Sequence, residues 1–142
     1  MTIERILEGR DAAILTCNAS ALVSEATALM AERRIGALPV IEEGDIVGIF
    51  SERDVIYKLH EFGRIAMDKT VRDVMTSPPV VVAPETEVIE ALSLMTRRRI
   101  RHLPVMESGR MIGFISIGDL VKYRIDQVQA EAEAMRTYIQ TA

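Results

Sequence analysis

Apolar residues along the chain follow two spacings that alternate with each other. After Ser20, apolar residues lie three, six and seven positions beyond Val23, at Ala26, Leu29 and Met30, which places all four on one helix face. Short apolar runs bounded by turn residues predict strands. The first half is therefore expected to run strand, helix, strand, strand, helix. The predicted ranges are strands Ala12–Cys17, Ala37–Ile41 and Ile46–Phe50, and helices Ser20–Arg34, ended by Gly36, and Ser51–Phe62.

The second half shows the same order of patterns. Its predicted elements are strand Val80–Val82, helix Glu87–Arg99, strands His102–Met106 and Met111–Ser116, and a helix from Ile117. Two further short helices are predicted, Thr2–Leu7 capped by Thr2, and Thr70–Met75, in which Thr70 and Asp73 have capping-box spacing. The stretch Gly63–Lys69 is expected to be a linker.

The two halves are copies of each other in sequence. Leu94–Val121 reads LMTRRRIRHLPVMESGRMIGFISIGDLV, and Leu29–Ile56 reads LMAERRIGALPVIEEGDIVGIFSERDVI, at a constant offset of 65 residues. A unit of about 60 residues is marginal alone, so the copies are expected to pack together as a pseudo-twofold α/β (α+β) module. The predicted division is 1–62, first repeat with the N-terminal helix; 63–77, linker with a short helix; 78–124, second repeat; 125–142, C-terminal helix extension.

The last helix continues beyond the repeat with a heptad pattern of apolar residues. These lie at alternating spacings of 3 and 4, at Ile125, Val128, Ala132, Met135 and Ile139. Two interpretations are open: the stripe packs on the chain's own body, or it contacts a second subunit. Two heptads are too short for an independent coiled coil.

The amino-acid composition limits the kind of core, ligand and cellular compartment to be expected. Of the 142 residues 49% are hydrophobic but only 4% aromatic, which predicts an aliphatic core. The net charge of −4 argues against a general nucleic-acid binder. One cysteine fits a reducing compartment, and no signal peptide or membrane-spanning run is evident. We expect a cytoplasmic protein without a membrane partner.

Each repeat carries a Ser-x-x-Asp motif where a strand meets a helix. The pairs are Ser51 with Asp54 and Ser116 with Asp119. Such a motif forms a helix N-cap, with the serine oxygen accepting from the third helical amide. An aspartate here could also accept both hydroxyls of a ribose, and the free amides suit phosphate. The two roles are compatible.

A basic cluster stands out in this acidic chain. It comprises Arg97, Arg98, Arg99, Arg101 and His102. One interpretation is a solvated helix end, because arginine suits the carbonyl end of a helix. The other is an anion site, because arginine offers a planar fork to phosphate.

The first repeat differs from the second at these basic positions. The counterparts of Arg101 and His102 are Gly36 and Ala37, so the two clefts should differ, and the first copy could rely on Arg53. Gly48 and Gly113 sit within strands, and indicate either close approach of a ligand or a bulge or tight packing.

The chain resembles a tandem pair of cystathionine-β-synthase-type (CBS) domains, also called a Bateman module. The resemblance lies in an order of features that is present twice: strand, helix, LPV strand, hairpin and Ser-x-x-Asp. The resemblance covers about residues 12–125 and is nearest to small stand-alone bacterial CBS-pair proteins, on GIFSERDV, VRDVMT and RRIRHLPV. It implies a regulatory module with adenosine-type ligands in clefts between the repeats. AMP or another adenine nucleotide is the expected ligand, NAD a further candidate, and no metal is required.

The resemblance also implies a set of ligand-binding residues. In such modules the aspartate takes the ribose, the serine lies near phosphate, and residues around LPV flank the base. Thr16 matches a threonine that often contributes, although its counterpart is Val81. The implied residues are Thr16, Ala37, Leu38, Pro39, Ser51, Arg53, Asp54, Arg99, Arg101, His102, Leu103, Pro104, Ser116 and Asp119.

The resemblance further implies a homodimer that signals to a separate, unknown protein. Two other classes stay open: a ligand-free structural or docking module, and a nucleic-acid binder using the Arg97–His102 cluster, which the charge and the few aromatics disfavour. Catalysis has little support, because no glycine-rich phosphate loop is present and Cys17 on a predicted strand is expected to be inert core.

Overall fold

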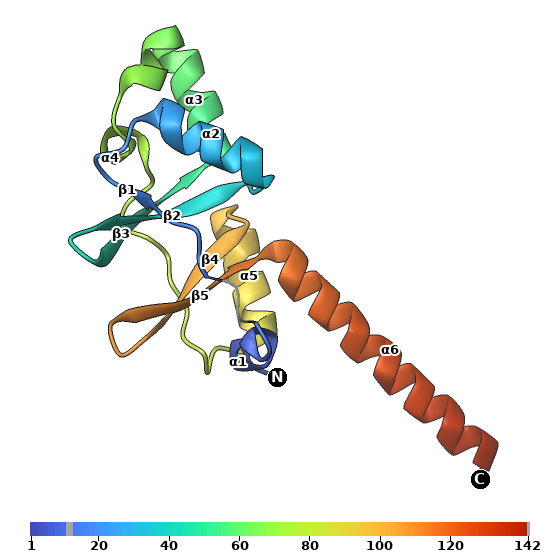
Figure 1. The fold of residues 1–142 in the computed structure, drawn as a ribbon. Helices are drawn as coiled ribbons and strands as arrows, with labels where there is room; N and C mark the ends of the chain where they lie inside the picture. Colours follow the sequence, from blue (N-terminus) through green and yellow to red (C-terminus); the bar gives the residue numbers. More distant parts are fainter. Residues whose placement is uncertain (11–12, 142) are drawn as a thin grey trace.

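The computed structural model describes residues 1–10 and 13–141 and contains two halves of the same design (Figure 1). The first half comprises β1 (Cys17–Asn18), α2 (Val23–Arg33), β2 (Ala37–Glu42), β3 (Asp45–Ser51) and α3 (Glu52–Phe62). The second comprises α5 (Val88–Arg98), β4 (His102–Glu107), β5 (Arg110–Ser116) and α6 (Ile117–Thr141). Between them lie η1 (Gly63–Asp68), a 3₁₀ helix where a linker was expected, and α4 (Val71–Val74); α1 (Ile3–Leu7) precedes the first half.

The expected α/β fold with two pseudo-twofold repeats is confirmed. The hairpins are equivalent: Val40 pairs with Gly48 before a register shift in the first, and Val105 with Gly113 before a shift in the second. Each hairpin lies against its own aliphatic core, one of which includes Leu38 and Phe50 and the other Leu103 and Ile115.

The first strand of each repeat is much shorter than predicted. Ala12 lies outside the described residues, and only Cys17 of the rest of the predicted Ala12–Cys17 strand is in β1, which pairs in parallel with β2. In the second repeat the predicted Val80–Val82 strand is reduced to one parallel bridge from Val82 to Val105. Cys17 and Val82 are equivalent positions and pair with the equivalent Val40 and Val105, so both repeats keep this parallel contact with their hairpins, which the first repeat extends to Asn18.

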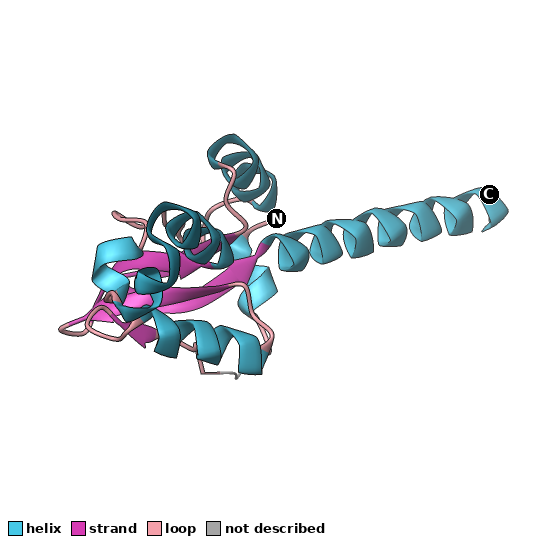
Figure 2. Cartoon of the chain, turned by 90° about the horizontal axis from the view of Figure 1, so that it is seen from above, coloured by secondary structure: helices cyan, strands magenta, loops and turns pink. Residues whose placement is uncertain are grey.

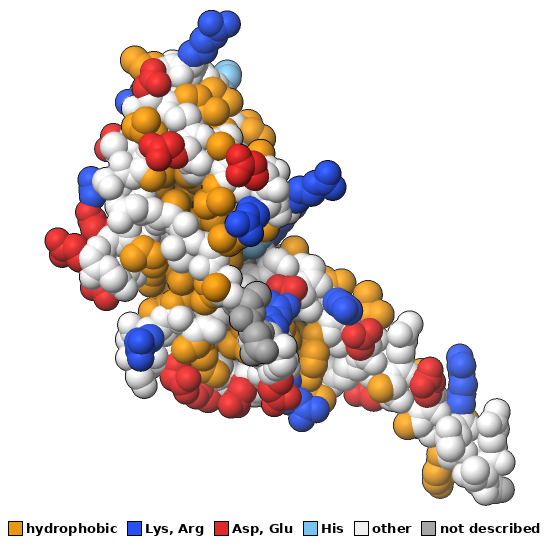
Figure 3. Space-filling view, viewed as in Figure 1, with side chains coloured by type: hydrophobic (Ala, Val, Ile, Leu, Met, Phe, Trp, Pro, Cys, Tyr) orange, Lys and Arg blue, Asp and Glu red, His pale blue; other side chains and the backbone are white. Residues whose placement is uncertain are grey.

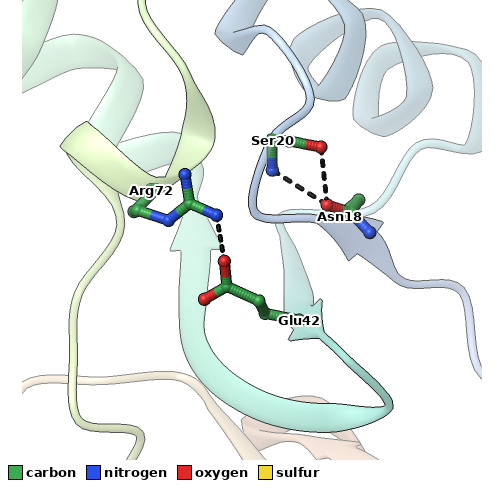
Figure 4. Close-up of polar contacts among 4 residues, drawn as sticks. All are labelled: Asn18, Ser20, Glu42 and Arg72. Carbon is green, nitrogen blue, oxygen red and sulfur yellow. Dashed lines mark hydrogen bonds and ion pairs between the residues drawn. The ribbon is translucent and has the colours of Figure 1, made fainter.

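Some predicted helix caps differ in the structure. Ser20 bonds Asn18 and does not cap α2, whose N-cap is Leu22 (Figure 4). Thr2 and Thr70 precede α1 and α4 without a side-chain cap. α2 ends at Arg33, where Arg34 takes the left-handed conformation with φ 53°, and not at Gly36.

Each core is completed by the short helix that precedes the other repeat. α1 contributes Ile3 and Ile6 to the second core, and α4 contributes Val71 and Val74 to the first. Figure 1 shows α1 beside α5 at the lower end of the molecule and α4 in the upper half. Equivalent bonds hold both: the Val88 amide donates to the Met1 carbonyl, and the Val23 amide donates to the Lys69 carbonyl.

A side-chain ion pair adds to the docking of α4 on the first repeat. Arg72 of α4 pairs with Glu42 at the end of β2 (Figure 4). Both side chains are partly exposed, so the pair contributes little to stability beside the buried Val71 and Val74.

The two strand glycines are explained by close packing. A Cβ at Gly48 would lie 2.8 Å from the Thr76 carbonyl oxygen and 2.7 Å from the Met75 sulfur. A Cβ at Gly113 would lie 2.6 Å from Cδ2 of Leu7. Gly48 therefore makes room for the chain after α4, and Gly113 makes room for the side chain of Leu7, the last residue of α1.

α6 leaves the body after its first turns. Its single fully buried residue among those described is Leu120, and Figures 1 and 2 show the helix projecting away from the rest of the chain. Ile125 is 51% exposed and Met135 60%, so the interpretation in which this stripe packs on the chain's own body is wrong. Hydrophobic atoms are visible along the projecting helix in Figure 3.

Candidate functional site: two clefts around Asp54 and Asp119

Both Ser-x-x-Asp motifs form the predicted N-caps. The Asp54 amide donates to Ser51 Oγ (3.4 Å), and the Ser51 amide donates to Asp54 Oδ2 (2.9 Å). The second copy repeats this exchange, with 3.2 Å from the Asp119 amide to Ser116 Oγ and 2.8 Å from the Ser116 amide to Asp119 Oδ2. The exchange fixes each carboxylate at the start of its helix and presents Oδ1 away from the cap.

The group that meets Oδ1 differs between the two aspartates. Thr76 Oγ1 donates to Asp54 Oδ1 at 3.1 Å. Asp119 Oδ1 instead lies 2.7 Å from Nη2 of Arg10, which follows α1. Burial acts to raise the pKa of the Asp119 carboxyl, but the bonds from Arg10 and Ser116 outweigh it and hold that pKa below its usual range.

A cavity of about 450 Å³ lies beside Asp54, and both repeats line it. We call it the first cleft. From the first repeat it receives Ala37, Ser51, Glu52, Arg53 and Asp54, with Ile56 and Tyr57 from α3 and Thr76 from the chain after α4. The second repeat supplies Arg99, Arg101 and His102. Three of the five residues of the basic cluster therefore gather with Asp54, whereas Arg97 and Arg98 do not line this cavity. The Arg53 guanidinium donates to the Arg99 carbonyl across the two repeats.

A cavity of about 320 Å³ lies beside Asp119, and we call it the second cleft. Its walls are mostly apolar, including Leu7, Ile14, Leu15, Ile35 and Ile112. The remaining walls are Ala13, Ala37, Gly113 and Phe114, with Arg10, His102, Ser116 and Asp119 as the polar side chains. Volumes of about 300–1,000 Å³ are usual for small-molecule sites.

Ala37 and His102 line both clefts, and they are equivalent positions of the two repeats. They form the wall where the clefts meet. The His102 ring stacks on Phe114 at 5.5 Å between centroids. Burial lowers the pKa of the His102 imidazole and Arg101 adds to this, against the opposing effect of the Glu52 and Asp119 carboxylates. The ring is therefore mainly neutral at pH 7.

Other predicted site residues lie away from the clefts. Leu38 and Leu103 belong to the two cores, and Pro39 and Pro104 are buried behind the cleft walls. Thr16 is exposed, precedes β1, and is not among the residues that line either cavity. Within 1–10 and 13–141, no group of three or more histidine, cysteine or acidic side chains could hold a metal ion.

Sequence reasoning missed Arg10, Thr76 and Tyr57 as lining residues. A signal for the first two was present: TIERIL at Thr2–Leu7 matches TVRDVM at Thr70–Met75 in its threonine and apolar positions, at an offset of 68. The chain after α1 is therefore three residues longer than the chain after α4 when each reaches its repeat. This connection carries Arg10 to Asp119.

Comparison with known proteins agrees with this geometry. The family model for the CBS domain matches residues 10–61 and 71–126. The chain belongs to the CBS-domain family. A mitochondrial CBS domain-containing protein of Arabidopsis thaliana, CBSX3, is 37% identical over 92% of this chain, which spans 66% of that protein.

Solved structures of CBS-domain proteins match over most of their length. A CBS-domain protein from Burkholderia ambifaria is 40% identical with a TM-score of 0.83, over 89% of this chain and 95% of that one. CBSX2, solved in complex with AMP, is 28% identical with a TM-score of 0.74, over 90% and 98% of the two chains. The neighbours are CBS-pair proteins, as this chain is.

Proposed function

We propose that this CBS pair is a regulatory module that binds adenosine-containing ligands, AMP, ADP, ATP or NAD, between its repeats. The observation that carries the proposal is the pair of cap-fixed aspartates, Asp54 and Asp119, each on the wall of a cavity shared by both repeats. A carboxylate held in this way is a preorganised acceptor for the vicinal hydroxyls of a ribose. The AMP complex of the related CBSX2 supports this ligand class.

The first cleft is the proposed nucleotide site. Its lining holds three guanidinium groups, from Arg53, Arg99 and Arg101, against the carboxylates of Glu52 and Asp54. Among the described lining residues this leaves one net positive charge. A phosphate group is stabilised there by charge-assisted hydrogen bonds from arginine. Ser51, at the start of α3, supplies a further polar group beside Asp54.

In this proposal the protein is a sensor and does not catalyse a reaction. It senses the energy state of the cell through AMP, ADP and ATP, or the redox state of the cell through NAD. A ligand that touches both repeats shifts their relative packing only by its differential affinity for the two arrangements. The Arg53 bond to the Arg99 carbonyl already links the repeats across this cleft and would respond to such a ligand. The signal would pass to a separate protein.

We further propose that the protein works as a homodimer in the cytoplasm. The exposed seam of α6 supports the dimer, because a heptad stripe in water gains from burial against an equivalent stripe. No helix within the described residues is long and apolar enough to span a membrane. The Arabidopsis relative is named as mitochondrial, so localisation needs a direct test, by fractionating cells and probing each fraction with an antibody.

A thermal-shift panel tests the ligand proposal. The compounds are AMP, ADP, ATP and NAD, against wild type, Asp54→Asn and Asp119→Asn. Each aspartate accepts from the amide of its capping serine, and an asparagine side chain keeps an oxygen that can accept this bond, so these variants remove the charge and keep the fold. Asp45→Asn, at the exposed start of β3, is the matched control.

The size of the expected shift follows from mass action. A ligand at about 100 times its dissociation constant stabilises the fold by about 2.7 kcal/mol. This corresponds to several degrees in melting temperature. We expect shifts that Asp45→Asn retains and at least one cleft variant loses. Failure of every compound to shift nucleotide-free, folded wild type would favour a docking module in which both aspartates act only as caps.

A further inference from the structure

The second cleft differs from the first in charge as well as in size. Among its described lining residues the ionised side chains are Arg10 and Asp119, and these two are paired with each other at 2.7 Å. The charges of the described lining residues therefore cancel. Leu7, Ile14 and Ile112 are among the apolar walls that surround the pair.

Arg10 is engaged before any ligand arrives. Its guanidinium compensates the Asp119 carboxylate, which keeps Asp119 ionised and oriented. A carboxylate accepts about four hydrogen bonds, and Asp119 receives two in the structure, from Arg10 on Oδ1 and from the Ser116 amide on Oδ2. Acceptor capacity therefore remains for ribose hydroxyls while Arg10 stays in place.

A phosphate group would meet a different situation. A dianion entering this cleft would lose water against apolar walls, and the guanidinium nearest to it is already neutralised. Recruiting Arg10 would leave Asp119 uncompensated. Burying a charge without a partner costs more than burying a neutral group.

We propose that the second cleft takes an uncharged adenosine-type nucleoside, one with no phosphate, and that the Arg10–Asp119 pair sets this preference. The inference rests on the proposed adenosine-binding function and assigns the two clefts to different ligand classes. The first cleft takes the phosphorylated ligand, and the second takes the nucleoside.

Calorimetric titration with adenosine and AMP tests the assignment, in wild type, Asp54→Asn and Asp119→Asn. Adenosine binding should fall on the order of tenfold or more in Asp119→Asn and persist in Asp54→Asn, since a lost hydrogen bond to a charged group costs about 1.5–3 kcal/mol. AMP should show the opposite pattern. In Asp54→Asn the remaining site should prefer adenosine to AMP on the order of tenfold.

A charge-adding variant tests the physical cause. Ile112 is on the wall of the second cleft and is 42% exposed, so a lysine there can fold with its ammonium at the rim. In the Asp54→Asn background, Ile112→Lys should strengthen AMP binding on the order of tenfold and leave adenosine binding unchanged. Ile112→Gln is the uncharged control and should strengthen neither.

Three outcomes would overturn the inference. One is AMP binding that is lost in Asp119→Asn and weakened in Arg10→Gln, because Arg10 would then bind the phosphate group. Another is Ile112→Lys leaving AMP binding unchanged. The third is adenosine failing to bind Asp54→Asn while wild type still binds AMP, which refutes the second site but leaves the proposed function intact. Absence of binding by wild type to both compounds would instead count against the proposed function.

Discussion

Gly48 and Gly113 are equivalent glycines with different neighbours, so adding a methyl group to each should have unequal effects. At Gly48 the new Cβ would face the Thr76 carbonyl oxygen at 2.8 Å, about 0.7 Å inside the ~3.5 Å of a favourable contact. That carbonyl accepts from the Ile49 amide at 3.0 Å, and the Thr76 amide donates back at 2.9 Å. The backbone there cannot retreat without losing both hydrogen bonds.

The magnitude follows from opposing contributions. Overpacking of this kind costs about 1–3 kcal/mol. Alanine has a smaller conformational entropy than glycine in the unfolded chain, which stabilises the folded state by about 0.4–1 kcal/mol. Gly48→Ala should therefore lower the free energy of unfolding by about 1–2 kcal/mol. At Gly113 the obstacle is the tip of Leu7, a side chain that borders the second cleft and has room to turn. Gly113→Ala should stay within about 1 kcal/mol of wild type.

Urea unfolding measures the difference. With a slope of about 1–3 kcal/mol per molar, Gly48→Ala should lower the urea midpoint by roughly 0.3–2 M. Any cost of Gly113→Ala should vanish in a Leu7→Ala background, where the obstructing tip is absent. Met75→Ala should rescue Gly48→Ala only in part, because the Thr76 carbonyl remains. Equal costs at the two glycines, or a larger cost at Gly113, would refute this account of the packing.

Three further predictions concern the thiol, the last helix and the shared wall of the clefts. Burial raises the pKa of the Cys17 thiol to about 11, so iodoacetamide at pH 8 should label it only after unfolding; rapid labelling of folded protein would contradict this. Ile125→Glu should convert a dimer to a monomer in light scattering, whereas Ala130→Glu, off the seam, should leave the dimer intact. His102 has a lowered pKa when folded, so the unfolded chain binds more protons just below pH 6.5 and stability should fall from pH 7 to pH 5. His102→Gln should reduce that loss, measured by urea unfolding at both pH values; an unchanged loss would exclude His102 as its source.

The repeat in the sequence predicted most of the fold because the same local rules act twice. Both Ser-x-x-Asp caps and both hairpins follow from turn and cap residues close in sequence. The strand prediction at Ala12–Cys17 failed in its described part because an apolar run indicates burial, not pairing, and only β1 reaches the edge of β2. Ser20 failed as a cap because Asn18 takes its hydroxyl and amide.

The part of the candidate site that the repeats themselves supply could be predicted from the sequence. The part supplied by the segments that connect to the repeats could not. The sequence indicated that Arg101 and His102 would make the clefts unequal, and the structure brings both beside Asp54. The match of TIERIL with TVRDVM indicated the longer chain after α1 that carries Arg10, but it did not indicate the partner, because Asp119 is more than a hundred residues away. Non-local contacts of this kind leave no periodicity in the sequence.

The exchange of short helices between the repeats has a consequence for the order in which the chain folds during synthesis. The first core draws on residues from Cys17 to Val74, so it can close while the second repeat is still being made. The second core needs Ile3 and Ile6, which leave the ribosome early and must wait until Leu120 has emerged. At synthesis rates of about 5–20 residues per second, α1 stays without its partners for several seconds. The apolar face of this helix is thus the part of the nascent chain exposed longest to chaperones and to misassembly.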